Sequence, residues 1–190
     1  MVRNADASDY PRIIAVMKDW WGGRDLTHML PRIFLEHFRD TSWVVEKDQA
    51  LVGFLIGFFY HRTGATKAIS ISSVFIRTFW GMGVGAFLYG RFTMACRKNG
   101  RDVIRSCTSP ANKASISFHK RLGFEIEKGD TKIDGISVAL DYNRPGDSKV
   151  LLRSLGLIPR RYCCHLNTPG CFLYYFLSVS LHYRQIFFQA

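Results

Sequence analysis

Three glycines at alternate positions, Gly81, Gly83 and Gly85, separate a strand-like run from a helix-like run. Residues 69–76 are rich in β-branched side chains, whereas residues 86–98 repeat apolar side chains at helical spacing and end at an Asn-Gly pair. A strand that passes through glycines into a helix gathers backbone N–H groups around one point, at the positive end of the helix dipole. The pattern therefore predicts a cradle for an anion such as a pyrophosphate.

The spacing of these glycines excludes two common phosphate-binding loops. No Lys-Ser or Lys-Thr pair follows Gly85, as a Walker loop requires, and G-x-G-x-G differs from the dinucleotide pattern G-x-G-x-x-G. Glycine suits such a loop because a side chain would keep the phosphate away from the backbone. Taken alone, the loop could also be a tight turn without a ligand.

The remaining sequence predicts alternating helices and strands in one domain. A helix begins near Ser8 or Asp9 with Pro11 in its first turn, and Pro31 opens a short second helix whose apolar face is Ile33, Phe34, Leu35 and Phe38. A short strand at 2–3 precedes these helices. The predicted elements after them are strands at 41–46 and 50–59 joined by a polar turn, a strand at 103–107, a helix after Asn112, and a closing hairpin of 124–127 with 136–142.

Composition fits a folded chain in a reducing compartment. The 190 residues include 47% apolar and 22% charged side chains, which favours one globular domain with a core. The polar start of the sequence lacks a signal-peptide pattern, and the five cysteines form no paired spacing, so we expect a cytoplasmic protein with free thiols. The formal charge of +11 is compatible with nucleic acid, an anionic membrane or a phosphate-rich ligand, because the basic residues are scattered.

A second motif, residues 112–124, lies about 30 residues after the glycines and runs from Asn112 through Ser115 and His119 to Gly123-Phe124. With the glycine loop and the order of elements, it resembles the GNAT superfamily of N-acetyltransferases over about residues 1–150. The resemblance implies an α+β, three-layer fold with a mostly antiparallel central sheet, a splayed strand pair and helices on both faces. We expect this domain to cover residues 1–154.

The resemblance also implies a reaction. Acetyl-CoA would donate its acetyl group to a primary amine that attacks the thioester directly, so neither a cysteine nucleophile nor a metal is required. His119 falls where many relatives carry a tyrosine that protonates the leaving thiolate, and a histidine can act as an acid near neutral pH; a surface role on a basic helix is the alternative. The residues implied to bind the coenzyme are Gly81, Met82, Gly83, Val84, Gly85, Ala86, Asn112 and Ser115.

The acceptor is not identified by the sequence beyond a small-molecule or peptide amine, and we expect no nucleic-acid partner. Glu46, Asp25 and His28 are candidates for a general base by position only, with solvated surface charge as the alternative. Trp20 and Trp21 could wall the acceptor pocket or pack in the core. The apolar run 171–181 is about half the ~20 residues that a transmembrane helix needs.

Two segments depart from the family pattern, residues 60–78 and the tail 155–190, and Trp80 stands where the family has a basic or amide side chain before the glycines. Codons can be chosen for residues 69–78 that, read from the third base, encode the family-like strand Ile-His-Phe-Val-Gly-Val-His-Pro-Asp. We therefore hypothesise that residues 60–78 are an out-of-frame stretch, and that the tail, which we expect to be a packed or disordered appendage, has a similar origin. Coding DNA without compensating insertions or deletions relative to close relatives would refute this.

Two other functions are compatible with the sequence. The first is a degenerate, catalytically weak coenzyme-A-binding domain, which would bind acetyl-CoA without turnover. The second is a basic module for nucleic acid or membrane surfaces that uses Arg160, Arg161 and the aromatic tail, and it predicts steeply salt-dependent binding.

Overall fold

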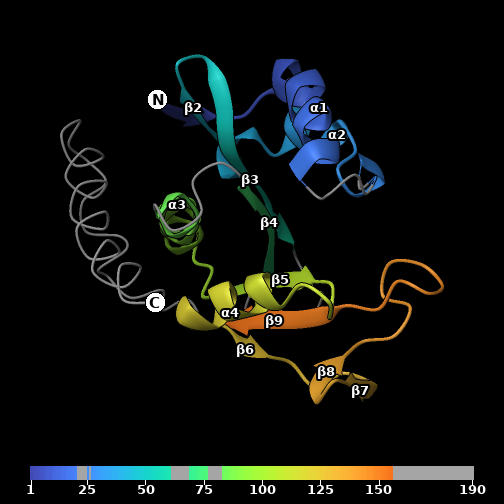
Figure 1. Ribbon diagram of the computed structural model, residues 1–190. Coiled ribbons are helices and arrows are strands. Elements are labelled where there is room, and N and C mark those ends of the chain that lie inside the picture. The colour runs from blue at the N-terminus through green and yellow to red at the C-terminus, as the bar shows by residue number, and fades with distance from the viewer. Residues whose placement is uncertain (21–24, 26, 61–68, 77–82, 156–190) are drawn as a thin grey trace, which may run out of the picture. The chain divides into compact units, whose positions relative to one another are not determined.

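The computed structural model describes residues 1–20, 25, 27–60, 69–76 and 83–155 (Figure 1). These residues fall into two compact units, one containing described residues of 1–58 and 74–92 and the other those of 59–73 and 93–155. The elements in chain order are β1 (Val2–Asn4), η1 (Ala7–Asp9), α1 (Tyr10–Trp20), η2 (Thr27–Met29), α2 (Ile33–His37), η3 (Arg39–Thr41), β2 (Trp43–Lys47), β3 (Ala50–Tyr60), β4 (Ile69–Ile76), α3 (Val84–Lys98), β5 (Val103–Thr108), α4 (Lys113–Arg121), β6 (Glu125–Ile126), β7 (Thr131–Ile133), β8 (Ile136–Val138) and β9 (Val150–Ser154).

In the first unit, β1, β2 and β3 form an antiparallel arrangement. β1 pairs with β2 through Arg3 opposite Val44, and β2 pairs with β3 through Val44 opposite Phe54. The turn between β2 and β3 contains Asp48 and Gln49, both with positive φ, at 50° and 65°. Two successive left-handed residues are the geometry of a tight hairpin turn. The predicted hairpin is therefore confirmed.

Helices α1 and α2 cover one face of this strand group (Figure 1). Their shared core consists of fully or almost fully buried apolar side chains from α1, α2, β2, β3 and the connecting segments: Ala5, Ile13, Met17, Leu30, Leu35, Val44, Phe54 and Ile56. The predicted apolar face of α2 is wrong at Ile33, which is 53% exposed. A helix of one and a half turns buries only a narrow stripe, here centred on Leu35.

The opposite face of β2 and β3 packs against α3. The Trp43 and Phe92 rings meet edge to face with centroids 6.4 Å apart. Gly57 of β3 approaches the Phe92 ring so closely that a Cβ atom there would lie 2.3 Å from Cε2. Helices therefore cover both faces of the sheet within this unit, as the fold class requires.

Helix α1 starts at Tyr10, directly after the start near Ser8 or Asp9 that the sequence predicts. A short η1 turn precedes the helix and is capped by Asp6: the Asp6 side chain accepts from the Ser8 N–H, and the Asp9 side chain accepts from the Asp6 N–H in return. This capping box closes a short η1 turn, after which α1 starts at Tyr10 with Pro11 in its first turn.

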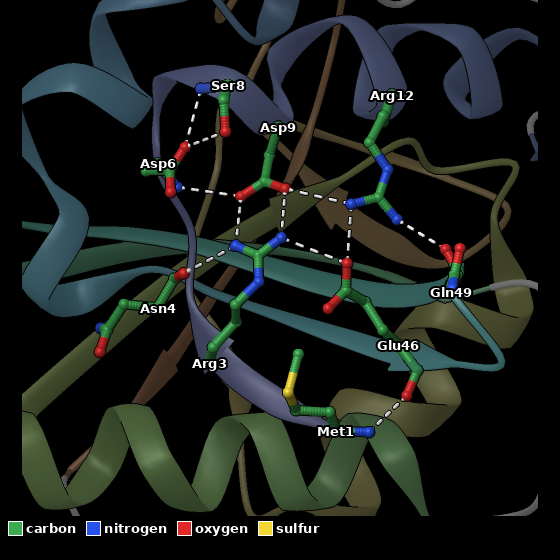
Figure 2. A network of polar contacts seen from close by, with 9 residues as sticks. All are labelled: Met1, Arg3, Asn4, Asp6, Ser8, Asp9, Arg12, Glu46 and Gln49. Carbon is green, nitrogen blue, oxygen red and sulfur yellow. Dashed lines mark hydrogen bonds and ion pairs between the residues drawn. The ribbon is translucent and has the colours of Figure 1, made fainter.

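A polar network fastens the start of the chain to α1 and to the β2–β3 hairpin (Figure 2). Arg3 donates two hydrogen bonds to the Asp9 carboxylate at 2.6 and 2.7 Å and a third to Glu46 at 3.2 Å. Arg12 donates to Glu46 at 2.7 Å and to the Gln49 carbonyl oxygen at 2.9 Å. Asp9 is only 2% exposed, so its charge is compensated inside the protein.

In the second unit, β5 lies between β4 and β9. It pairs in parallel with β4 and antiparallel with β9, which also pairs with β6, while β7 and β8 form a separate hairpin. The predicted closing hairpin is therefore wrong, since β6 pairs with β9 and not with residues 136–142. The hairpin was assigned wrongly because the true partner of β6 was missed. Residues 150–154 alternate buried and more exposed side chains, as a strand does, but the sequence predicted no strand there.

The fold class is confirmed as mixed α+β: the pairs β1–β2, β2–β3, β5–β9, β6–β9 and β7–β8 are antiparallel, and the pair β4–β5 is parallel. Residues 61–68 and 77–78 of the unusual segment 60–78, and the tail after residue 155, lie outside the described residues, so the frame-shift hypothesis and the domain boundary at 154 stay predictions. Across the residues that are described, no helix has the length and apolar character needed to cross a membrane.

Candidate functional site

The N-terminus of α3 has the geometry of an anion site. Gly83 adopts a positive φ of 77°, which favours glycine, and its carbonyl oxygen accepts the Phe87 N–H at 2.9 Å. The amides of Val84, Gly85 and Ala86 follow in the first turn of a 15-residue helix, where N–H groups have no intrahelical acceptor. These donors and the helix dipole favour an anion at this end.

The structure corrects the extent of the predicted loop. The helix was expected from Ala86 but starts at Val84, so Gly85 and Ala86 are helical residues. The buried side chains of Val84 and Ala86, 2% and 8% exposed, anchor this first turn. Gly81 and Met82, also predicted to bind the coenzyme, lie outside the described residues.

Asn112 caps α4 in the second unit. Its side-chain oxygen accepts the Ser115 N–H at 3.0 Å, and its backbone carbonyl accepts the Ile116 N–H at 3.1 Å. This is the usual use of asparagine at a helix start. The structure therefore gives Asn112 a structural task, and the predicted contacts of Asn112 and Ser115 with a coenzyme stay predictions.

His119 is buried in the second unit, with 5% of its surface exposed. Its Nδ1 lies 2.8 Å from the Ser115 carbonyl oxygen, and because a carbonyl oxygen only accepts, Nδ1 carries the proton. The Phe118 and Phe124 rings meet the imidazole edge to face, with centroids 5.3 and 5.2 Å away. His119 thus links α4 to the segment that follows the helix.

These surroundings oppose the proton-donor role that the sequence suggested for His119. Desolvation by burial lowers its pKa to about 4, although the hydrogen bond to Ser115 acts in the other direction. At neutral pH the imidazole is uncharged, and with the proton on Nδ1 its Nε2 is an acceptor. The sequence could not foresee this, because helical spacing alone does not say which face of α4 is covered.

The three positional candidates for a general base have different surroundings. Glu46 is engaged by Arg12 and Arg3; the hydrogen bond from Arg12 chiefly lowers its pKa, against the effect of desolvation. Asp25 accepts from the Thr27 N–H and hydroxyl at 3.0 and 2.6 Å. His28 is exposed. Glu46 and Asp25 thus serve local structure.

Trp20 stacks on Phe54, with centroids 5.9 Å apart, and Trp21 lies outside the described residues.

β4 and β5 pair over only part of their length. Their register runs from Ile69 opposite Val103 to Ile71 opposite Arg105, and among the described residues no later pair joins them, although β5 continues to Thr108. The last residues of β5 keep their other partner, because Cys107 and Thr108 still pair with β9. This is the splayed strand pair that the sequence predicted.

An ordered loop that the sequence did not predict leaves the sheet at this end of β5. Its base is closed by Ala139 and Lys149, which exchange backbone hydrogen bonds of 2.8 and 2.9 Å. The loop between them carries Tyr142, which is 46% exposed. The predicted strand 136–142 is therefore wrong at Tyr142, and the Asn-Arg-Pro-Gly run directly after this residue is a turn signal.

The described cysteines fit packing better than nucleophilic chemistry. Cys96 is 1% exposed, and burial raises the pKa of the Cys107 thiol. A thiol with a raised pKa is a poor nucleophile at neutral pH. Among the described residues, no three His, Cys, Asp or Glu side chains are grouped as a metal site.

Comparison with known protein families identifies the family to which this chain belongs. The family model described as Acetyltransferase (GNAT) family matches residues 10–124, more than half of the chain. The chain belongs to the GNAT acetyltransferase family. The match spans the glycine loop, the start of α3 and the Asn112 helix, so the resemblance predicted from the sequence is confirmed.

Solved structures share the GNAT fold at low sequence identity. Ard1 from Thermoplasma volcanium is 20% identical with a TM-score of 0.64 and covers 82% of this chain and 96% of its own. A structure of yncA from Salmonella typhimurium with its cofactor acetyl-CoA is 18% identical, with a TM-score of 0.60 and coverage of 82% and 92%. Diaminobutyrate acetyltransferase EctA from Paenibacillus lautus, in complex with L-2,4-diaminobutyric acid and coenzyme A, is 19% identical, with a TM-score of 0.58 and coverage of 82% and 95%. Curated protein sequences give no match.

Proposed function

We propose that this GNAT protein transfers the acetyl group of acetyl-CoA to a primary amine. The observation that carries the proposal is the N-terminus of α3, where Gly83 adopts a positive φ directly before the helix and the amides of the first helical turn have no intrahelical acceptor. Those amides would hold the pyrophosphate of the coenzyme. Gly81 and Met82 would extend the cradle, and Asn112 and Ser115 would contact the coenzyme from α4.

The reaction proceeds by direct attack. The amine nitrogen, in its uncharged form, bonds to the thioester carbonyl carbon, and the carbon–sulfur bond then breaks to release the coenzyme A thiolate. The nitrogen loses a proton, and the thiolate gains one. The thioester would lie where β5 separates from β4, so that strand amides polarise its carbonyl oxygen.

The acceptor class stays open between small amines and peptide amines, and a cytoplasmic location stays a prediction. Structural neighbours at or below 20% identity share the fold and do not transfer their acceptors to this chain. A catalytically weak coenzyme-binding domain is the second candidate. It is favoured by Trp80, which puts an uncharged indole where relatives have a basic or amide group, and by the buried state of His119.

Thiol release separates the two candidates. The full chain is incubated with acetyl-CoA and a panel of amines that includes diamines, lysine and short peptides with free N-termini, and release of the coenzyme A thiol is followed. An acetyltransferase accelerates release with at least one amine and yields the acetylated product. Binding of acetyl-CoA without acceleration by any amine would instead identify the weak domain.

A further inference from the structure

Arg91 of α3 has hydrogen-bond donors that the protein does not satisfy. Its Nε atom is buried and has no hydrogen-bond partner. Among the described residues, no carboxylate forms an ion pair with its guanidinium. Buried polar groups in folded proteins are nearly always hydrogen-bonded to protein, to water or to a bound ion. A buried cationic donor without a protein acceptor therefore points to an anionic ligand.

The Phe87 ring fixes the direction of the Arg91 side chain. Cζ of Arg91 lies over the ring, 5.5 Å from its centroid, which is a cation–π contact. Phe87 precedes Arg91 by four residues in α3, and long side chains on a helix lean towards its N-terminus. Both residues are only partly buried, so a ligand can reach the pair. The guanidinium is thus turned towards the start of α3.

A row of residues along α3 connects this pair to the glycine turn. The Phe87 N–H donates to the Gly83 carbonyl oxygen at 2.9 Å, and Arg91 follows Phe87 by four more residues. Residues four apart share one face of a helix and are separated by about 6 Å along its axis. Because Arg91 leans back to Phe87, its guanidinium lies only about 6 Å along the axis from Gly83. All three residues belong to the first unit.

Arg91 is also the first basic residue after the glycine loop. Residues 78–90 contain no lysine or arginine, and Trp80 stands where the family has a basic or amide side chain. The backbone amides of a first helical turn carry only partial charges. Arginine adds a full charge and a planar fork of N–H groups that matches the oxygens of a phosphate. Within residues 78–91, Arg91 is therefore the one source of a full positive charge.

We propose that Arg91 binds the 3′-phosphate of coenzyme A and thereby selects the coenzyme over its dephospho form. The inference rests on the proposed binding of the coenzyme's diphosphate at the start of α3. Coenzyme A carries its third phosphate on the ribose, and this sugar ring alone separates it from the diphosphate. With the diphosphate at the amides that follow Gly83, the ribose phosphate would meet the guanidinium about one turn further along α3.

Calorimetry with two ligands tests the role of Arg91. Coenzyme A and 3′-dephospho-coenzyme A differ only in the phosphate concerned, and the Kd of each is measured with the full chain and with Arg91→Met. Methionine keeps an unbranched side chain but removes the charge and every N–H donor. Arg97→Met is the matched control, since Arg97 is an exposed arginine in the last turn of the same helix. Arg91→Gln, which is also uncharged, is a second variant, and thermal unfolding checks that each chain is folded.

We expect the original chain to bind coenzyme A about tenfold or more tightly than the dephospho form, as a hydrogen bond to a charged group contributes. Arg91→Met and Arg91→Gln should each raise the Kd for coenzyme A by about tenfold and leave that for the dephospho form within a factor of about three. The preference then disappears in both variants, whereas Arg97→Met should retain it.

Two results would overturn the role of Arg91 while leaving coenzyme binding intact. The first is an original chain that binds both ligands equally well. The second is a loss of affinity in the folded Arg91 variants that is the same for both ligands, because the missing contact would then not involve the 3′-phosphate. A folded original chain that binds neither ligand would overturn the proposed function as well.

Discussion

The imidazole Nδ1 of His119 lies 2.8 Å from the carbonyl oxygen of Ser115, one turn earlier in α4. The backbone carbonyl oxygen of His119 accepts the Phe124 N–H at 3.0 Å, so His119 joins the helix to the following segment through both its side chain and its backbone. A residue held in this way contributes to stability, and its protonation opposes folding.

The stability of the protein should therefore fall in acid as His119 is protonated. Its folded pKa of about 4 lies below the ordinary value of 6.5, so its contribution is complete above pH 6.5 and is lost as the pH falls towards 4. The shift corresponds to about 3 kcal/mol of unfolding free energy. Urea unfolding at several pH values measures it, and His119→Leu should flatten this part of the curve. An equally steep curve for His119→Leu would contradict the assignment.

Asp9→Asn should destabilise the first unit strongly. Desolvation would raise the pKa of Asp9, but hydrogen bonds from Arg3 and from the Asp6 N–H outweigh it, so the folded state favours the carboxylate. Removing the buried charge leaves Arg3 without its main partner, at a cost of about 3 kcal/mol. Glu36→Gln is the control, because its ion pair with Arg32 is exposed and should matter by less than about 0.5 kcal/mol. Equal effects of the two changes on unfolding in urea would refute this ranking.

Gly57→Ala should also destabilise the protein. The added methyl group would lie 2.3 Å from Cε2 of Phe92, so the ring or the strand has to move, at a cost of about 1–3 kcal/mol. A double-mutant cycle with Phe92→Leu provides the control, because the smaller side chain relieves the overlap. Additive effects of the two substitutions would show that the close approach is not the cause.

Replacing Asp48-Gln49 by Asn-Gly should stabilise the β2–β3 hairpin. Both positions have positive φ, which asparagine and glycine adopt more readily than aspartate and glutamine do. We expect a gain of about 0.5–1 kcal/mol, measured as a rise in the urea midpoint. The hydrogen bond from Arg12 to the carbonyl of residue 49 uses the backbone and should survive. A lower midpoint would indicate that the side chains of Asp48 or Gln49 contribute more than the turn geometry does.

Local signals predicted much of the fold. The hairpin, α2 after Pro31 and α4 after Asn112 follow from turn chemistry, proline position and capping, which act over a few residues. The pairing of β6 with β9 could not be predicted in the same way, because register between strands more than twenty residues apart depends on tertiary packing. The missed strand at 150–154 was the element needed to see it.

Some features of the candidate site could be predicted from local sequence signals, and others could not. The positive φ of Gly83 could be predicted, because glycine is the residue that favours this conformation where a strand passes into a helix. The burial of His119 could not be predicted, because the sequence of a nine-residue helix with basic side chains at its end does not show which of its residues are covered. The loop that carries Tyr142 was hidden by its apolar start, which resembled a longer strand.

Calorimetry of acetyl-CoA binding tests the central claim that backbone amides at the start of α3 hold the coenzyme's phosphates. Gly83→Asp and Gly83→Asn form the matched pair, since both side chains tolerate positive φ and differ chiefly in charge. The account predicts that the original chain binds, that Gly83→Asn binds more weakly, and that Gly83→Asp loses at least about tenfold more because its carboxylate repels the phosphates. Undiminished binding by Gly83→Asp, or no binding by the folded original chain, would contradict it.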